Sequence, residues 1–157
     1  MPPRDRPPGP ALDDVSIAII AQLQEDGRRP YASIGKAIGL SEAAVRQRVQ
    51  KLIETGVMQI VAVTDPMQVG FHRAAMMGIT VSGDVEAVAN DVATLDEVDY
   101  VVMTAGGYDI LAEVIVEDDE ALLAVANRKI RSIPGVVRTE TFVYLKLLKQ
   151  SYTWGTP

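Results

Sequence analysis

Apolar side chains in the first quarter of the chain recur at three- and four-residue steps, the spacing of one face of an α-helix. This spacing predicts a helix near residues 13–25, with an apolar face that includes Ile17, Ile20 and Leu23. Asp13 or Asp14 is suited to cap its N-terminus, because a carboxylate can accept hydrogen bonds from the free N–H groups there.

Two more short helices follow. The first has Pro30 in its opening turn, ends at Gly39, and is expected to bury Ile34, Ala37 and Ile38. The second has Ser41 as its N-cap, ends at Thr55-Gly56, and is expected to bury Val45, Val49, Leu52 and Ile53. Two helices joined by a tight glycine turn are typical of a helix-turn-helix, whose second helix lies in the DNA major groove.

After Gly56 the pattern changes to runs of Val, Ile and Thr, which are typical of strands. Residues 57–63 predict a connecting strand that ends at Asp65-Pro66. The second half then predicts the order β-α-β-β-α-β, the ferredoxin-like split pattern. The expected strands are 74–82, 98–105, 110–116 and 136–149, and the expected helices are 84–95 and 118–133.

These elements predict an α+β fold with a helix-turn-helix followed by a ferredoxin-like domain. The segments we expect are a disordered tail at 1–11, a DNA-binding domain at 12–56, a connecting strand and linker at 57–72, a ferredoxin-like effector-binding and oligomerisation domain at 73–150, and a C-terminal tail at 151–157.

The composition narrows the class of protein. Cysteine is absent, so there is no disulfide framework and no thiolate metal site, and we expect neither a metal nor a cofactor. No apolar run is long enough to span a membrane, and the N-terminus lacks the apolar core of a signal peptide. We therefore expect a cytoplasmic protein with no membrane partner.

The net charge of −6 is unusual for a DNA-binding protein, but it is unevenly distributed. Residues 1–60 hold eight Lys and Arg against seven Asp and Glu, a balance of +1, while residues 61–157 hold seven against fourteen, a balance of −7. Phosphate contact depends on the local patch rather than on the total. We expect weak non-specific DNA binding unless several copies act together.

The helix beginning at Ser41 carries the candidate DNA contacts. Ser41 and Arg46 are the best candidates, because a recognition helix contacts bases mainly from its N-terminal part. The alternative is an ordinary solvated helix face. Arg48 and Lys51 either contact phosphates or pair with Glu54, and Tyr31 either lies in the core or touches the DNA backbone through its hydroxyl. The full expected set is Tyr31, Ser41, Glu42, Arg46, Gln47, Arg48 and Lys51.

The stretch Gly106-Gly107-Tyr108-Asp109 has two interpretations. One is a hairpin turn in which glycine supplies positive φ. The other is a ligand loop whose N–H groups hold a carboxylate while Asp109 accepts from an ammonium group. These residues alone favour the hairpin turn.

Taken together, these stretches resemble the Lrp/AsnC (feast/famine) family of transcriptional regulators. The matching segments are 12–28, 31–57, Asp65-Pro66 with Gly70, 106–114 and 133–146. The resemblance implies an N-terminal winged helix-turn-helix and a C-terminal ligand-sensing domain. It further implies homodimers formed through the C-terminal sheets, assembly into larger rings, often octamers, and binding of amino acids or related metabolites between dimers. Residues implied at that effector site are Gly106, Gly107, Tyr108, Asp109, Thr139 and Thr141.

We therefore predict a non-enzymatic, sequence-specific DNA-binding regulator that responds to an amino acid or similar effector. One alternative is an enzyme similar to the sirohaem decarboxylases, which use His and Arg, but His72 is the only histidine and the arginines of the second half are scattered. Another is a metabolite sensor without DNA binding.

Overall fold

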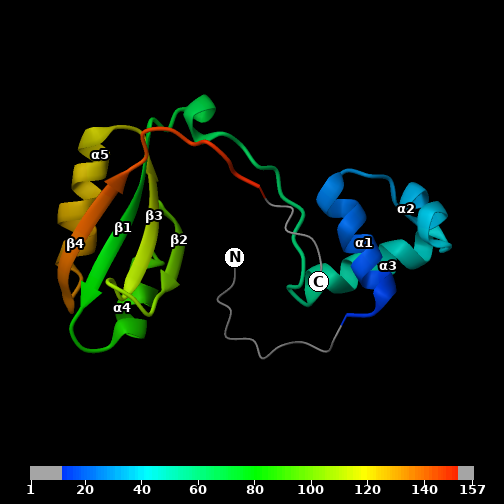
Figure 1. Cartoon of the computed structure of the whole chain (residues 1–157), viewed down its shortest axis with the longest axis horizontal. Helices are drawn as coiled ribbons and strands as arrows, with labels where there is room; N and C mark the ends of the chain where they lie inside the picture. The colour runs from blue at the N-terminus through cyan, green and yellow to red at the C-terminus, as the bar shows by residue number, and fades with distance from the viewer. Residues whose placement is uncertain (1–11, 152–157) are drawn as a thin grey trace. The chain divides into compact units, whose positions relative to one another are not determined.

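The computed structural model in Figure 1 describes residues 12–151. Its contacts divide into two compact units, one with the three N-terminal helices and one spanning Val63–Leu148. The predicted tail 1–11 lies outside the described residues, as does all of the predicted tail 151–157 except its first residue.

The first unit consists of α1 (Asp14–Glu25), α2 (Tyr31–Ile38) and α3 (Glu42–Glu54), as the apolar spacing predicts. The Asp13 carboxylate caps α1 by accepting the Ser16 N–H at 2.9 Å. Gly39 ends α2 with a φ of 75°, a conformation that glycine adopts without steric cost. The small core contains Ile19, Ile20, Leu23, Ile34, Val45, Val49 and Leu52.

Three expectations about this part of the chain are wrong. Ile53 is 43% exposed and Ala37 is also exposed, because three short helices enclose only a narrow core. Residues 57–63 form no strand, and Val61 there is 68% exposed. A strand needs a neighbour to satisfy its backbone groups, and no strand within residues 12–151 pairs with this segment.

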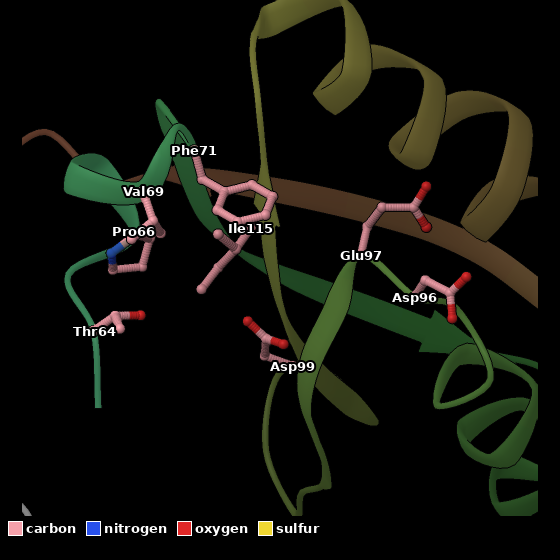
Figure 2. Close-up of a pocket in the computed structure, with 8 residues that line it drawn as sticks. All are labelled: Thr64, Pro66, Val69, Phe71, Asp96, Glu97, Asp99 and Ile115. Carbon is pink, nitrogen blue, oxygen red and sulfur yellow. The ribbon is translucent and has the colours of Figure 1, made fainter. Parts of the chain in front are cut away.

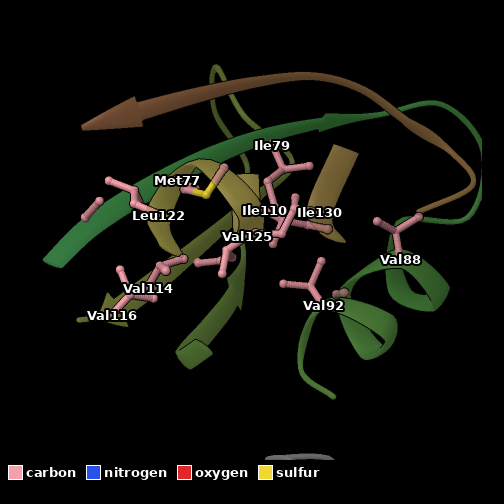
Figure 3. Packing of buried hydrophobic residues seen from close by; sticks show 13 residues of the cluster. Met77, Ile79, Val88, Val92, Ile110, Val114, Val116, Leu122, Val125 and Ile130 are labelled. Atoms are coloured by element: carbon pink, nitrogen blue, oxygen red, sulfur yellow. The ribbon is translucent and has the colours of Figure 1, made fainter. Parts of the chain in front are cut away.

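The second unit is a four-stranded antiparallel sheet in the order β2-β3-β1-β4. The strands are β1 (Arg73–Val81), β2 (Val98–Met103), β3 (Ile110–Val116) and β4 (Val136–Val143). One face is covered by α4 (Val85–Val92) and α5 (Asp119–Ala124). Figure 3 shows Met77, Ile79, Ile110 and Val114 of the sheet packed with Leu122, Val125 and Ile130. The predicted α+β class is confirmed.

Two elements depart most from their predicted bounds. The expected helix 118–133 ends as α5 at Ala124 and continues as a π-helical segment, η2 (Val125–Lys129), and a 3₁₀ turn, η3 (Ile130–Ser132). Val125 and Ile130 are both buried, and five residues turn an α-helix by about 140°, so a wider turn is needed to keep both inward. The final strand ends at Val143 rather than Lys149.

Candidate DNA-binding surface and effector site

The helix α3 is held by one face and exposed on the other. Val45, Val49 and Leu52 are buried against the other two helices. At its N-terminus the Ser41 hydroxyl accepts the Ala44 N–H at 3.2 Å, which confirms Ser41 as the N-cap. The remaining face points to solvent, as the major-groove assignment requires.

Arg46 lies at the boundary between α3 and α2. Its guanidinium donates to Glu42 at 2.7 Å and lies 5.4 Å from the centre of the Tyr31 ring. Its side chain is 62% exposed, so the cation is accessible although it is oriented by both neighbours. Tyr31 itself is half-buried and packs against the helical core.

Arg48 is bound within the unit. Its Nη1 donates to Asp13 Oδ2 at 2.7 Å and to the Ser16 hydroxyl at 3.3 Å, which ties α3 to the start of α1. Hydrogen bonds from Ser16 and then from Arg48 lower the pKa of Asp13 to about 2. The alternative pairing of Arg48 with Glu54 is wrong, because Arg48 pairs with Asp13, while Glu54 accepts from Gln50 at 2.8 Å.

The turn between β2 and β3 is built around Asp109. Its carboxylate accepts the Val81 N–H at 2.8 Å, and its own N–H donates to Ile79 O at 3.0 Å. Asp109 therefore fixes the turn to the end of β1. Gly106 and Gly107 are exposed, and neither has a positive φ. The expectation that glycine supplies a positive φ in this hairpin turn is therefore wrong.

Tyr108 follows these glycines and lies on the sheet face opposite the helices. Its ring covers Gly78 of β1, where an added Cβ would come within 2.7 Å of ring carbons. Its hydroxyl donates to Glu140, which raises the pKa of Tyr108. The ring also meets Phe142 edge-on, with centroids 6.1 Å apart.

Thr139 and Thr141 lie on the other side of the sheet. They pair with Ile79 and Met77 of β1, whose side chains point into the core beneath the helices. Both threonines line a pocket of about 360 Å³, together with Asp119, Leu122, Leu123, Ala126, Asn127 and Arg131. Within one chain the structure thus separates Thr139 and Thr141 from Tyr108 of the predicted effector set.

Sequence reasoning missed a second pocket of about 360 Å³ in the same unit (Figure 2). Its apolar side comes from the turn η1 (Pro66–Val69), from Phe71 and from Ile115, and its acidic side from Asp96, Glu97 and Asp99. Glu97 pairs with Lys129 at 2.5 Å, which lowers the pKa of Glu97, while its Oε2 is buried without a hydrogen-bond partner. The acidic run Asp96-Glu97 was a signal for it, but the apolar half comes from a distant segment.

Among residues 12–151, no helix is long and apolar enough to cross a membrane. No group of three or more His, Cys, Asp and Glu side chains in that range is arranged to hold a metal ion.

A helix-turn-helix joined to a four-stranded α+β domain defines a class of DNA-binding regulators with a separate sensing domain. Residues 12–53 match the AsnC-type helix-turn-helix domain, and residues 74–154 match the Lrp/AsnC ligand binding domain. The chain belongs to the Lrp/AsnC family of transcriptional regulators, which confirms the resemblance.

Named relatives agree with this assignment. The chain is 34% identical over 143 residues to the HTH-type transcriptional regulator FL11 of Pyrococcus abyssi, covering 90% of this chain and 94% of that protein. The solved leucine response regulatory protein of Mycobacterium tuberculosis is 28% identical with a TM-score of 0.80, covering 88% and 96%. The solved structure of E. coli AsnC is 26% identical with a TM-score of 0.77, covering 89% of this chain and 96% of that chain.

Proposed function

We propose that this protein is a transcriptional regulator that binds double-stranded DNA through α3 and responds to an amino acid or related metabolite. The observation that carries the proposal is the exposed face of α3, with Arg46 and Lys51, in a chain whose second unit matches a ligand binding domain. A cytoplasmic location, where a transcriptional regulator would meet its target DNA, is part of this proposal.

Fluorescence anisotropy tests the DNA part, with labelled duplexes from upstream of its own and neighbouring genes titrated over a range of salt. Arg46→Ala and Lys51→Ala should each weaken binding and reduce the salt slope by about 1. Arg128→Ala in η2 removes the same charge from the other unit and serves as the matched control. Binding that is identical in all four proteins would contradict the assignment and would favour a sensor without DNA binding.

We place the effector in the pocket that holds Thr139 and Thr141, completed by residues 106–109 of a second copy. This arrangement accounts for the separation of Thr139 and Thr141 from Tyr108 within one chain. It also agrees with the binding of an effector between dimers, which the family resemblance implies. Asp119 and Arg131 line the same pocket and have the charges that an ammonium and a carboxylate group would meet.

A homodimer that assembles further, to an octamer in the resemblance, is part of this proposal. Large apolar side chains on the open face of the sheet support it, since Tyr100 is 51% and Phe142 45% exposed. Sedimentation of wild-type protein and Phe142→Glu tests it. The variant should sediment as a smaller species, and an unchanged assembly would rule out this face as the interface.

Thermal unfolding with each of the twenty amino acids tests the effector part, since a ligand that binds the folded state raises its stability. Thr141→Val should abolish the shift, whereas Thr94→Val, two residues beyond the end of α4, should retain it. A shift that survives in Thr141→Val would place the ligand elsewhere.

The enzyme alternative receives no support from the arrangement of basic side chains. Arg73 is bound to Asp119 and to the backbone oxygen of His72, Arg131 to Asn127 and Arg138 to Glu140, so these three guanidinium groups already have partners within the chain. Named relatives are transcriptional regulators. Adding sirohaem and recording the absorbance spectrum tests this alternative directly, and spectra that sum without change would exclude sirohaem binding.

A further inference from the structure

The solvent face of α3 has a narrow stripe directly opposite its buried face. Residues that follow a buried position by two lie about 200° around the helix from it. Gln47 stands in that relation to Val45, which is fully buried. The stripe comprises Ala43, Gln47, Gln50 and Glu54, and all four are exposed.

Most polar side chains of α3 are already bound within the unit. Arg46 is paired with Glu42 at 2.7 Å, Arg48 with Asp13 at 2.7 Å, and Gln50 with Glu54 at 2.8 Å. Two polar side chains of α3 remain unbound, and the structure describes every residue of this helix. The ends of the Gln47 and Lys51 side chains have no hydrogen bond or ion pair with residues 12–151.

These two side chains offer different chemistry to DNA. The Gln47 carboxamide presents one acceptor and one donor side by side, which matches the N6 donor and N7 acceptor of adenine in the major groove. Lys51 is a point charge on a flexible stem and suits a phosphate. On the assumption that the proposed function holds, we propose that Gln47 is a specificity-determining residue that reads an adenine in each operator half-site.

Ala43 strengthens this assignment. It lies one helical turn before Gln47 on the same stripe and is exposed. A methyl side chain lets the helix approach the base edges closely, and it can contact the C5-methyl group of thymine. The centre of the stripe is therefore suited to A·T base pairs and has no guanidinium for guanine.

Arg46 is the competing reader, because arginine recognises guanine. Its position argues for a different role. It lies about 100° from Val45, at the flank of α3, where Glu42 and the Tyr31 ring hold it. A contact to the phosphate backbone fits a cation held at the flank of the helix.

Selection of binding sites from random duplexes tests the inference for wild-type protein and four variants, Gln47→Ala, Gln47→Arg, Lys51→Ala and Arg46→Ala. Wild-type protein should enrich an A·T pair at one position of each half-site. Gln47→Ala should lose that preference, reducing discrimination at this position by about 5- to 150-fold. Gln47→Arg should switch the same position to G·C. Lys51→Ala is the control and should weaken binding to all sequences alike.

Failure of this inference differs from failure of the proposed function. If wild-type protein enriches a sequence but both Gln47 variants retain every position of it, Gln47 does not read a base and the inference is overturned. Enrichment of a G·C pair that only Arg46→Ala abolishes would assign base reading to Arg46 instead. If wild-type protein enriches no sequence, the proposed function fails as well. Far-ultraviolet circular dichroism confirms that each variant is folded.

Discussion

Arg48 and Asp13 join the recognition helix to the first helix of its unit, with Nη1 and Oδ2 2.7 Å apart. The same carboxylate caps α1 through the Ser16 N–H. One acidic side chain thus starts one helix and binds a basic residue of another, so Arg48 is a positioning residue for α3. The pairing also offsets part of the positive charge near the proposed DNA surface.

Asp13→Asn should separate these two roles. Asparagine caps helices as well as aspartate does, so α1 should remain intact while the charge is lost. Because the pKa of Asp13 is about 2 in the folded chain and 3.8 ordinarily, its ionised form stabilises the fold above about pH 4. The stability difference between wild type and variant should therefore disappear as the pH falls from about 4 to 2, measured by urea unfolding.

The control for that measurement is Asp14→Asn. Asp14 lies beside Asp13 in the first turn of α1, but the side chain that caps the helix is that of Asp13. The Asp14→Asn variant should change the pH dependence of the unfolding free energy less than Asp13→Asn does. An equal response in the two variants would mean that the Arg48 pairing does not stabilise the folded chain.

Gly35 in α2 should tolerate no side chain. A Cβ at this position would overlap the backbone oxygen of Leu40, in the turn that leads into α3. The backbone cannot move aside as a flexible side chain does. Gly35→Ala should therefore lower the free energy of unfolding of the helical unit by an amount near the upper end of about 1–3 kcal/mol. Thermal unfolding measures the loss, and DNA binding should weaken with it.

Gly27→Ala supplies the matched comparison. The nearest atom to a Cβ there is the Leu23 oxygen at 3.8 Å, which is ordinary contact. This variant should unfold within a few degrees of wild type. A Gly35→Ala protein as stable as Gly27→Ala would show that the turn into α3 is not tightly packed.

Local patterns in the sequence were sufficient for most of the fold. Ser41 followed by Val45, Val49 and Leu52 predicts both the start of α3 and its buried face, because capping and helical spacing act within a few residues. The run of apolar and β-branched residues at 110–116 likewise predicts a strand, and β3 has the same bounds, Ile110–Val116. These elements depend on neighbours in sequence.

Relationships between distant residues were not predictable in the same way. Arg48 and Asp13 are 35 positions apart, and no local pattern chooses Asp13 over Glu54 as the partner. The side of the sheet that Thr139 faces depends on its register with Ile79, which spacing within β4 alone does not supply. Residues 57–63 have the composition of a strand, but pairing depends on a neighbour that the sequence pattern does not reveal.

Glu97 and Lys129 offer a test in the second unit. Lys129 is 43% exposed and Glu97 30%, so a double-mutant cycle with Glu97→Gln and Lys129→Met should give a coupling of at most about 1 kcal/mol. The pKa of Glu97 is lowered by Lys129, so the coupling should be present at neutral pH and decline as the pH falls below about 4. A coupling that persists unchanged at pH 2 would show that charge does not carry it.

The Tyr108 ring packs directly on Gly78 of β1. Gly78→Ala would place a Cβ 2.7 Å from the Tyr108 ring, near the ring's attachment point, where the side chain cannot bend away. The ring must then leave β1 and lose its hydrogen bond to Glu140, at a cost of about 1–3 kcal/mol. Adding Tyr108→Ala should make the Gly78→Ala change nearly neutral, because the clash is then absent. Thermal unfolding of the two single variants and the double variant measures this, and additive losses would contradict the contact.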